Sequence, residues 1–307
     1  MSAARPSPRR LVPACLVPAL LALPLLLGAC RTAAPAAPAA VRIGAMSAAR
    51  AVPAHDNLNA VLWMQSAEEY RAVALGTYRA AEARLADALD DTTWSADPFQ
   101  ARGGGFGRLP AAVVLDVDET VLDNSPYQAR SAYDGTPYDP ATWGAWVREG
   151  HERAIPGALD YTRAAAARGI RVVYLTNRRA DEEAPTAARL AALGFPIADG
   201  DAILTRGERP GWAASDKDTR RAFVAGRYRI LQYLGDNLGD FLGHENDTPE
   251  ARRQMTAPYD AWWGMRWFAL PNPTYGSWET ALTRGLPAGS PADSARAAKR
   301  RALRVER

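Results

Sequence analysis

The sequence contains little histidine and almost no cysteine. Its three histidines, His55, His151 and His244, are too few and too widely spaced for a histidine-rich dinuclear metal centre. No Arg-His-Gly triplet that would mark a histidine nucleophile is present. The two cysteines, Cys15 and Cys30, lie within or directly after the N-terminal apolar stretch, which leaves no thiol for the rest of the chain. Nucleophilic and acid–base chemistry must therefore rest on carboxylates.

The N-terminus has the pattern of an export signal. A basic start precedes an apolar stretch over 11–27 that three prolines interrupt, which favours a secretory signal over a transmembrane helix. The small residues before Cys30 resemble a bacterial lipobox, in which the cysteine is lipidated. We predict a lipoprotein signal peptide at 1–29 and a lipidated tether at 30–56, rich in alanine and proline. A plain signal peptide with an incidental cysteine is the alternative.

The charge of the chain is balanced once the signal is removed. Residues 1–29 contain three arginines and no acid, so the remaining chain has 34 basic and 34 acidic residues. This balance argues against a nucleic-acid partner. We interpret residues 286–307 as a basic C-terminal tail, either a solvated helix end or a frayed segment, with contact to anionic lipid headgroups as the alternative. Its basic cluster comprises Lys299, Arg300, Arg301, Arg304 and Arg307.

Short apolar segments alternate with helical patterns along most of the chain. A helical region is expected at 57–90, with an apolar face of Leu58, Leu62, Tyr70, Val73, Tyr78 and Leu85. Strands are expected at 112–115, 171–175, 229–234 and 266–270. Helices are expected at 157–168, 181–193 and 216–226. This alternation predicts an α/β fold, a Rossmann-like parallel sheet flanked by helices, within one domain at 57–285.

Residues 124–156 interrupt the alternation. The segment is rich in proline and in tyrosine and tryptophan, including Tyr138 and Trp143. We predict a small cap-like insertion that lies over the ends of the strands.

Polar segments follow three of the predicted strands. Open parallel sheets bind ligands at the carboxyl ends of their strands, so these segments are expected to lie close together. Together with one lysine between the second and third, they supply carboxylates, a hydroxyl and an ammonium, the groups needed to make and break an aspartyl-phosphate on a divalent cation. The groups are Asp116-Val117-Asp118-Glu119-Thr120, Thr176-Asn177-Arg178, Lys217 and Gly235-Asp236-Asn237-Leu238-Gly239-Asp240.

The first of these segments provides the candidate nucleophile. Asp116 is expected to attack phosphorus while a cation and a lysine screen its charge. Asp118 lies two residues on, and residues i and i+2 of an extended segment point the same way. Asp118 is therefore a candidate to protonate the leaving oxygen and then to activate water. An ordinary acidic turn is the alternative for this short motif.

The remaining segments provide candidates for binding phosphate and metal. Thr176 is expected to donate its hydroxyl to a phosphate oxygen, with a helix cap as the alternative. Lys217 would neutralise the phosphate, although a lone lysine is usually a surface residue. Asp236 is expected to be a magnesium ligand beside Asp116. Asp240 would hold a metal-bound water or support Lys217, with capping or a surface pair as the alternative.

The four segments resemble, in order and spacing, the haloacid dehalogenase-like phosphohydrolases. Longer strings around Asp116, Thr176 and Asp236, and the segment 270–279, resemble class C acid phosphatases, including the bacterial lipoprotein e group often called 5′-nucleotidases. The resemblance covers roughly residues 57–285. It implies that Asp116 is the nucleophile and Asp118 the acid–base.

The resemblance also implies the ligands. Mg²⁺ would sit on Asp116, the main-chain carbonyl of Asp118 and Asp236. Thr176, Asn177 and Lys217 would hold the phosphate. Aromatic residues clamp the leaving group in the family, and the matching positions here are Tyr138, Trp143 and Tyr275, for which core packing is the alternative.

The expected function is hydrolysis of phosphomonoesters by a metal-dependent acid phosphatase, with nucleoside monophosphates as substrates. The family implies a homodimer. The lipobox implies an exported, membrane-anchored lipoprotein, which would lie at the outer membrane or the periplasmic face if the source is a Gram-negative bacterium. A transphosphorylase that uses a second alcohol instead of water is one alternative. A non-catalytic, ligand-binding surface lipoprotein on the same fold is the other.

Overall fold

The computed structural model describes residues 55–243, 247–287 and 290–306, which all belong to one unit, Val52–Arg307. The predicted signal peptide, Cys30 and nearly all of the predicted tether lie outside the described residues. Among the helices that are described, none is both long and apolar enough to cross a membrane.

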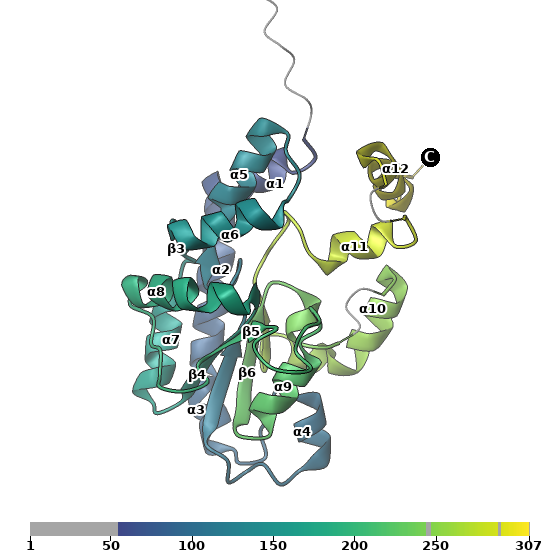
Figure 1. The fold of residues 1–307 in the computed structure, drawn as a ribbon. Coiled ribbons are helices and arrows are strands. Elements are labelled where there is room, and N and C mark those ends of the chain that lie inside the picture. The colour runs from purple at the N-terminus through teal and green to yellow at the C-terminus, as the bar shows by residue number, and fades with distance from the viewer. Residues whose placement is uncertain (1–54, 244–246, 288–289, 307) are drawn as a thin grey trace, which may run out of the picture. The chain divides into compact units, whose positions relative to one another are not determined.

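A five-stranded parallel sheet organises the fold (Figure 1). Its strands are β1 (Ala111–Leu115), β4 (Arg171–Arg179), β5 (Ile203–Arg206), β6 (Arg229–Gly235) and β7 (Trp267–Ala269). The strand order is β5-β4-β1-β6-β7 and all four pairings are parallel, which confirms the predicted sheet. After β1 the chain forms β4 and β5 on one side of it, and then crosses over to form β6 and β7 on the other side. Ligands bind at such switch points in open α/β sheets.

Helices cover both faces of this sheet because its central strands are apolar on both sides. Val113 and Leu115 of β1 face a core built with α2 (Glu68–Ala83), α3 (Leu85–Asp90), α7 (Ala158–Ala167) and α8 (Glu183–Leu193). Ala112 and Val114 face the opposite core, which contains residues of α9 (Asp218–Ala225) and the turn η3 (Ala257–Trp262).

The helical N-terminal region consists of three helices, α1 (Leu58–Ser66), α2 and α3. Ala67, which adopts an extended conformation, separates α1 from α2, and Arg84 separates α2 from α3. Half of the predicted apolar face is wrong. Leu58, Leu62 and Val73 are about half exposed, whereas the other three members of that face are buried. The buried face also includes Val61, Met64, Ala74 and Ala81, which lie between them in the sequence.

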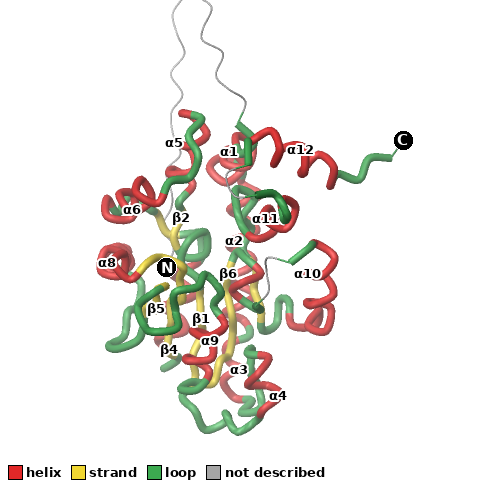
Figure 2. The backbone as a smooth tube through the Cα atoms, turned by 45° about the vertical axis from the view of Figure 1, so that its right-hand side comes forward, coloured by secondary structure: helices red, strands yellow, loops and turns green. Residues whose placement is uncertain are grey.

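The predicted insertion contains two helices, α5 (Ser125–Asp134) and α6 (Pro140–Glu149). The short antiparallel strands β2 (Leu122–Asp123) and β3 (Arg153–Ala154) pair at its base. Figures 1 and 2 show α5 and α6 beyond one end of the sheet, with α4 (Pro98–Gly103) at the opposite end. Tyr127 and Trp143 stack edge to face within the insertion, with ring centroids 5.1 Å apart.

The predicted basic tail contains a helix, α12 (Ala292–Ala302), which agrees with a helix end and not with a segment that is frayed throughout. The helices α10 (Pro249–Thr256) and α11 (Ser277–Thr283) precede it. Lys299 of α12 forms an ion pair with Glu279 of α11, and Arg296 lies 2.9 Å from Asp56. The basic cluster of 286–307 therefore belongs in part to a helix held by ion pairs.

Candidate active site

A cluster of carboxylates and one lysine lies where β1 and β6 end. Asp116 follows β1, Asp236 follows β6, and each contributes a carboxylate oxygen to a group that also includes Asp240. These oxygens lie within 4.8 Å of one another. Lys217, the residue before α9, contacts Asp116 and donates to Asp240 Oδ1 at 2.7 Å and to the carbonyl of Leu175 at 2.8 Å. The structure thus brings together four residues that the sequence singled out.

The local sequence explains how Asp240 reaches this cluster. The turn η2 (Leu238–Asp240) folds back on the end of β6, so that Asp240 Oδ2 accepts from the main-chain N–H of Asn237 at 2.9 Å. A Cβ on Gly235 would lie 2.2 Å from the Asp240 carboxylate, so only glycine leaves room for this packing. Asp240 contacts Lys217, as one of the two predicted roles requires, and belongs to the carboxylate group. It also caps the turn η2, which was the alternative.

The cluster gathers three carboxyl groups and one ammonium in a largely buried setting. Burial raises the pKa of Asp116 to about 7, opposed by the Lys217 ammonium and assisted by the Asp240 charge. The pKa of Asp236 is also raised well above its usual range, first by burial and then by Asp116. The three carboxyl groups, two of which contact Lys217, form a site of hard oxygen donors that favours a cation over protons. Such donors fit Mg²⁺, which prefers carboxylate and water oxygens.

Asp118 lies beside this group and is held by an arginine. Its Oδ1 accepts from Arg178 Nη2 at 2.8 Å, and its carboxylate is 16% exposed. Arg178 is the third residue of the segment Thr176-Asn177-Arg178, but its sequence position gave no indication of a role. Arg178 lies within β4, which runs four residues beyond the predicted strand, and a lone arginine there has no periodicity or spacing from which its partner could be inferred.

Thr176 and Asn177 occupy different environments. Thr176 lies within β4 and is fully buried, and its Oγ1 accepts from the main-chain N–H of Arg178 at 3.0 Å, so it does not cap a helix. It is not among the residues that line the cavity, and its contact to phosphate stays a prediction. Asn177 lines the cavity described below. Its Oδ1 accepts from Arg220 Nη2 at 2.6 Å, which leaves its amide N–H groups to face a ligand.

A cavity of about 520 Å³ opens above the carboxylates. Its walls include the three predicted aromatics, Tyr138, Trp143 and Tyr275. Tyr138 is 62% exposed, with its ring centroid 6.3 Å from that of Trp143, so core packing does not account for it. Tyr275 is held through its hydroxyl, which donates to the buried carboxylate of Glu119.

Several cavity residues were missed by the sequence reasoning. Arg206 ends β5, a strand too short to be recognised between its neighbours, and Ser215 lies in the following loop. His55 and Asn57 come from the residues before α1. Asn57 is tied to the C-terminal part of the domain, since its Nδ2 donates to the carbonyl of Thr274 at 2.6 Å. No local pattern signals such long-range contacts.

The parallel sheet, with carboxylates after its two central strands, is the haloacid dehalogenase-like fold that the motifs implied. The chain belongs to the HAD superfamily, subfamily IIIB, the acid phosphatases, whose family model matches residues 29–278. This membership confirms the resemblance seen in the sequence.

Solved structures support the same assignment. The class C acid phosphatase from Bacillus anthracis is 31% identical and superposes with a TM-score of 0.71 over 82% of this chain and 98% of that one. The tungstate-bound form of that enzyme matches at 30% identity, with a TM-score of 0.70 over the same shares of both chains.

Curated relatives match over a shorter region. Acid phosphatase 1 from Solanum lycopersicum is 29% identical over 165 residues, which cover 53% of this chain and 57% of that protein. The stem 28 kDa glycoprotein from Glycine max is 28% identical over 166 residues, or 53% of this chain and 58% of that protein. The chain thus spans little more than half the length of these relatives.

Proposed function

We propose that the protein is a divalent-cation-dependent phosphomonoesterase that works through an aspartyl-phosphate. The observation that carries this proposal is the buried carboxylate of Asp116 in contact with Lys217 and beside two further carboxylates. A lysine and a cation together allow an anionic nucleophile to approach an anionic phosphate.

In the proposed reaction Asp116 attacks phosphorus and forms a P–O bond as the bond to the leaving oxygen breaks. Asp118 gives its proton to that leaving oxygen. Asp118 then takes a proton from the water that attacks the phospho-enzyme, and cleavage of the acyl-phosphate bond restores Asp116. Lys217 and the amide of Asn177 bind the phosphate oxygens.

Asp116 and Asp236 would hold the divalent cation, with Asp240 next to them. When bound, the cation supplies charge neutralisation for the phosphate. The main-chain carbonyl of Asp118 is a third ligand expected from the family, and Mg²⁺ is the expected metal.

We propose nucleoside monophosphates as the substrate class. The aromatic rings of Tyr138, Trp143 and Tyr275 at the cavity wall support this proposal, because a flat base can stack on any of them. A leaving group without a flat ring would lack these contacts.

Phosphate release by the purified chain tests both proposals. AMP, nicotinamide mononucleotide, an aryl phosphate and a sugar phosphate would be compared, each with Mg²⁺ and with EDTA. We expect metal-dependent release that favours the nucleotides. Asp116→Asn should abolish release, whereas the exposed control Asp199→Asn should not change it. Full activity of Asp116→Asn would contradict the mechanism, and phosphorylated products from added alcohols would indicate a transphosphorylase.

We further propose that Cys30 is lipidated, that the lipid anchors the protein to a membrane outside the cytoplasm, and that the protein forms a homodimer. The lipobox supports the first two and family membership supports the third. Labelling of the wild-type chain, but not Cys30→Ser, by a fatty-acid probe in a bacterial host tests the anchor. Light scattering of the purified protein tests the dimer.

A further inference from the structure

Arg178 uses its whole guanidinium group inside the protein. Its Nη2 donates to Asp118 Oδ1 at 2.8 Å and to Glu152 Oε1 at 2.9 Å. Its Nη1 donates to Thr186 Oγ1 at 3.0 Å, and its Nε donates to Asp118 Oδ1 at 3.0 Å. The Arg178 side chain is 0% exposed. The arginine therefore joins the end of β4 to the candidate acid–base, to the insertion and to α8.

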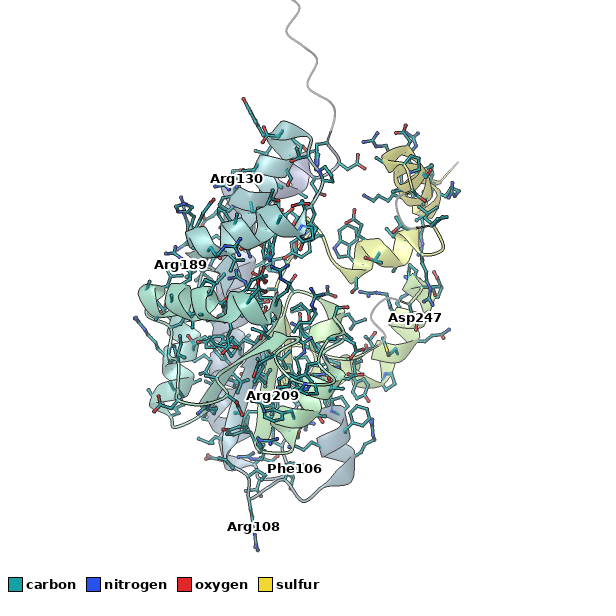
Figure 3. The ribbon with its side chains drawn as sticks, viewed as in Figure 1. Phe106, Arg108, Arg130, Arg189, Arg209 and Asp247 are labelled. Carbon is teal, nitrogen blue, oxygen red and sulfur yellow. The ribbon has the colours of Figure 1, made fainter. Side chains whose placement is uncertain are left out.

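Glu152 is the other buried member of this network. It precedes β3 at the base of the insertion, and its side chain is 0% exposed. Arg189 of α8, labelled in Figure 3, donates to the main-chain carbonyl of Glu152. Glu152 Oε2 accepts no hydrogen bond within the described part of the chain, but it forms an ion pair with Arg189, whose Nε lies 3.8 Å away. Apolar replacements of buried ion pairs are often as stable as the pair itself, so stability alone is a weak reason for this arrangement.

The contacts of Asp118 distinguish its two oxygens. Oδ1 accepts from Arg178 Nε and Nη2, and also from Asn124 Nδ2 at 3.0 Å. Trp146 Nε1 donates to Asn124 Oδ1 at 2.8 Å, which fixes the orientation of that amide. Oδ2 receives only a longer contact from Arg178 Nε at 3.3 Å, among the groups that the structure describes. Oδ2 is therefore the oxygen that remains available to a ligand in the cavity.

We propose that Arg178 is a positioning residue for Asp118, and that Glu152 holds Arg178 in place for this purpose. The pair fixes Oδ1 and thereby directs Oδ2, which carries the transferred proton, toward the leaving oxygen. The inference rests on the proposed function, in which Asp118 protonates that oxygen. Because Glu152 belongs to the base of the insertion, the same contact ties the acid–base to the segment that carries Tyr138 and Trp143.

The test exploits the different need of two esters for a general acid. Phosphate esters of 4-nitrophenol have a good leaving group and need little protonation, whereas glycerol phosphate has a poor one. The quantity to measure is kcat/KM, because it reports the transfer to Asp116 and not the later hydrolysis. Asp118→Asn should lower kcat/KM for glycerol phosphate by about 100-fold or more relative to the aryl ester, within the range that general acids contribute.

Arg178→Lys keeps the positive charge but cannot donate to Asp118 from two nitrogens at once. Glu152→Gln keeps the shape of the side chain but loses its negative charge. We expect both to lower kcat/KM for glycerol phosphate by about tenfold or more while the aryl ester changes by less than about threefold, a fraction of the general-acid contribution. Arg229→Lys is the matched control. Arg229 is also buried, and it donates to the carbonyls of Ala88, Leu89 and Asp91 at the start of β6.

The possible outcomes separate the two proposals. We expect Arg229→Lys to change kcat/KM for both esters by the same factor. If Arg178→Lys and Glu152→Gln also lowered kcat/KM equally for both esters, the network would have a structural role and the inference would be overturned. If Arg178→Lys fails to fold, Glu152→Gln decides alone. No hydrolysis of either ester by the wild-type protein, or an Asp118→Asn variant with unchanged kinetics, would instead overturn the proposed function.

Discussion

Removal of divalent cations should make the stability of the protein strongly dependent on pH. In the unfolded chain Asp116 loses its proton near its ordinary pKa of 3.8, whereas burial raises its pKa to about 7 in the folded protein. Between these values the folded state binds more protons than the unfolded state. The free energy of unfolding of the metal-free protein should therefore fall as pH rises from about 4 to 7.

The size of the effect follows from the same two pKa values. The pKa of Asp116 differs by about three pH units between the unfolded and the folded protein, and each unit corresponds to about 1.4 kcal/mol. Asp116 alone should therefore lower the free energy of unfolding by about 4 kcal/mol over this pH range. For a domain of this size, 1 kcal/mol shifts the unfolding temperature by roughly 2–4 °C, so a change of about 10 °C is expected. A bound cation should reverse the loss, because it stabilises the ionised carboxylates and binds the folded state preferentially.

Thermal unfolding followed by circular dichroism from pH 4 to 8, with EDTA or with Mg²⁺, measures this effect. Glu119, whose pKa burial raises to about 8, contributes in the same direction. The variant Asp116→Asn isolates the share of Asp116, since its amide does not titrate. An unfolding temperature in EDTA that stays constant from pH 5 to 7, or falls equally in Asp116→Asn, would refute the reasoning.

Three further predictions concern single side chains. Trp143→Ala should raise KM for AMP by about tenfold, because stacking on a base contributes about 1–3 kcal/mol, while glycerol phosphate is unaffected in the same assay. Gly235→Ala should lower the unfolding temperature and abolish phosphate release, because its Cβ would lie 2.2 Å from the Asp240 carboxylate; normal activity would contradict this. Lys217→Met should reduce kcat at least about 100-fold, since Asp116 loses its ammonium partner, and saturating Mg²⁺ should not restore it.

The sequence was sufficient to predict the central strands and the carboxylates that follow them. Buried parallel strands are short apolar runs, and Asp116 and Asp236 directly follow two of them. β5 was not predicted because Ile203–Arg206 is a short run that ends in polar residues. The exposure of Leu58 was not predicted because periodicity identifies an apolar stripe but not the surface that covers it.

The contacts of Asp118 and Arg178 show why part of the candidate site could not be predicted from the sequence. Asp118 and Asp116 are two residues apart in a recognisable motif, whereas Arg178 meets Glu152 only through the packing of β4 against the base of the insertion. Neither residue lies in a pattern that indicates its partner. Contacts of this kind depend on tertiary structure.

The antiparallel pair of β2 and β3 makes the insertion a module. The chain leaves the loop that carries Asp116 through β2 and returns through β3, so residues between 124 and 152 can change in length and shape without altering the register of the parallel sheet. An exchanged insertion must still present a carboxylate at Glu152, because that residue connects the module to Arg178.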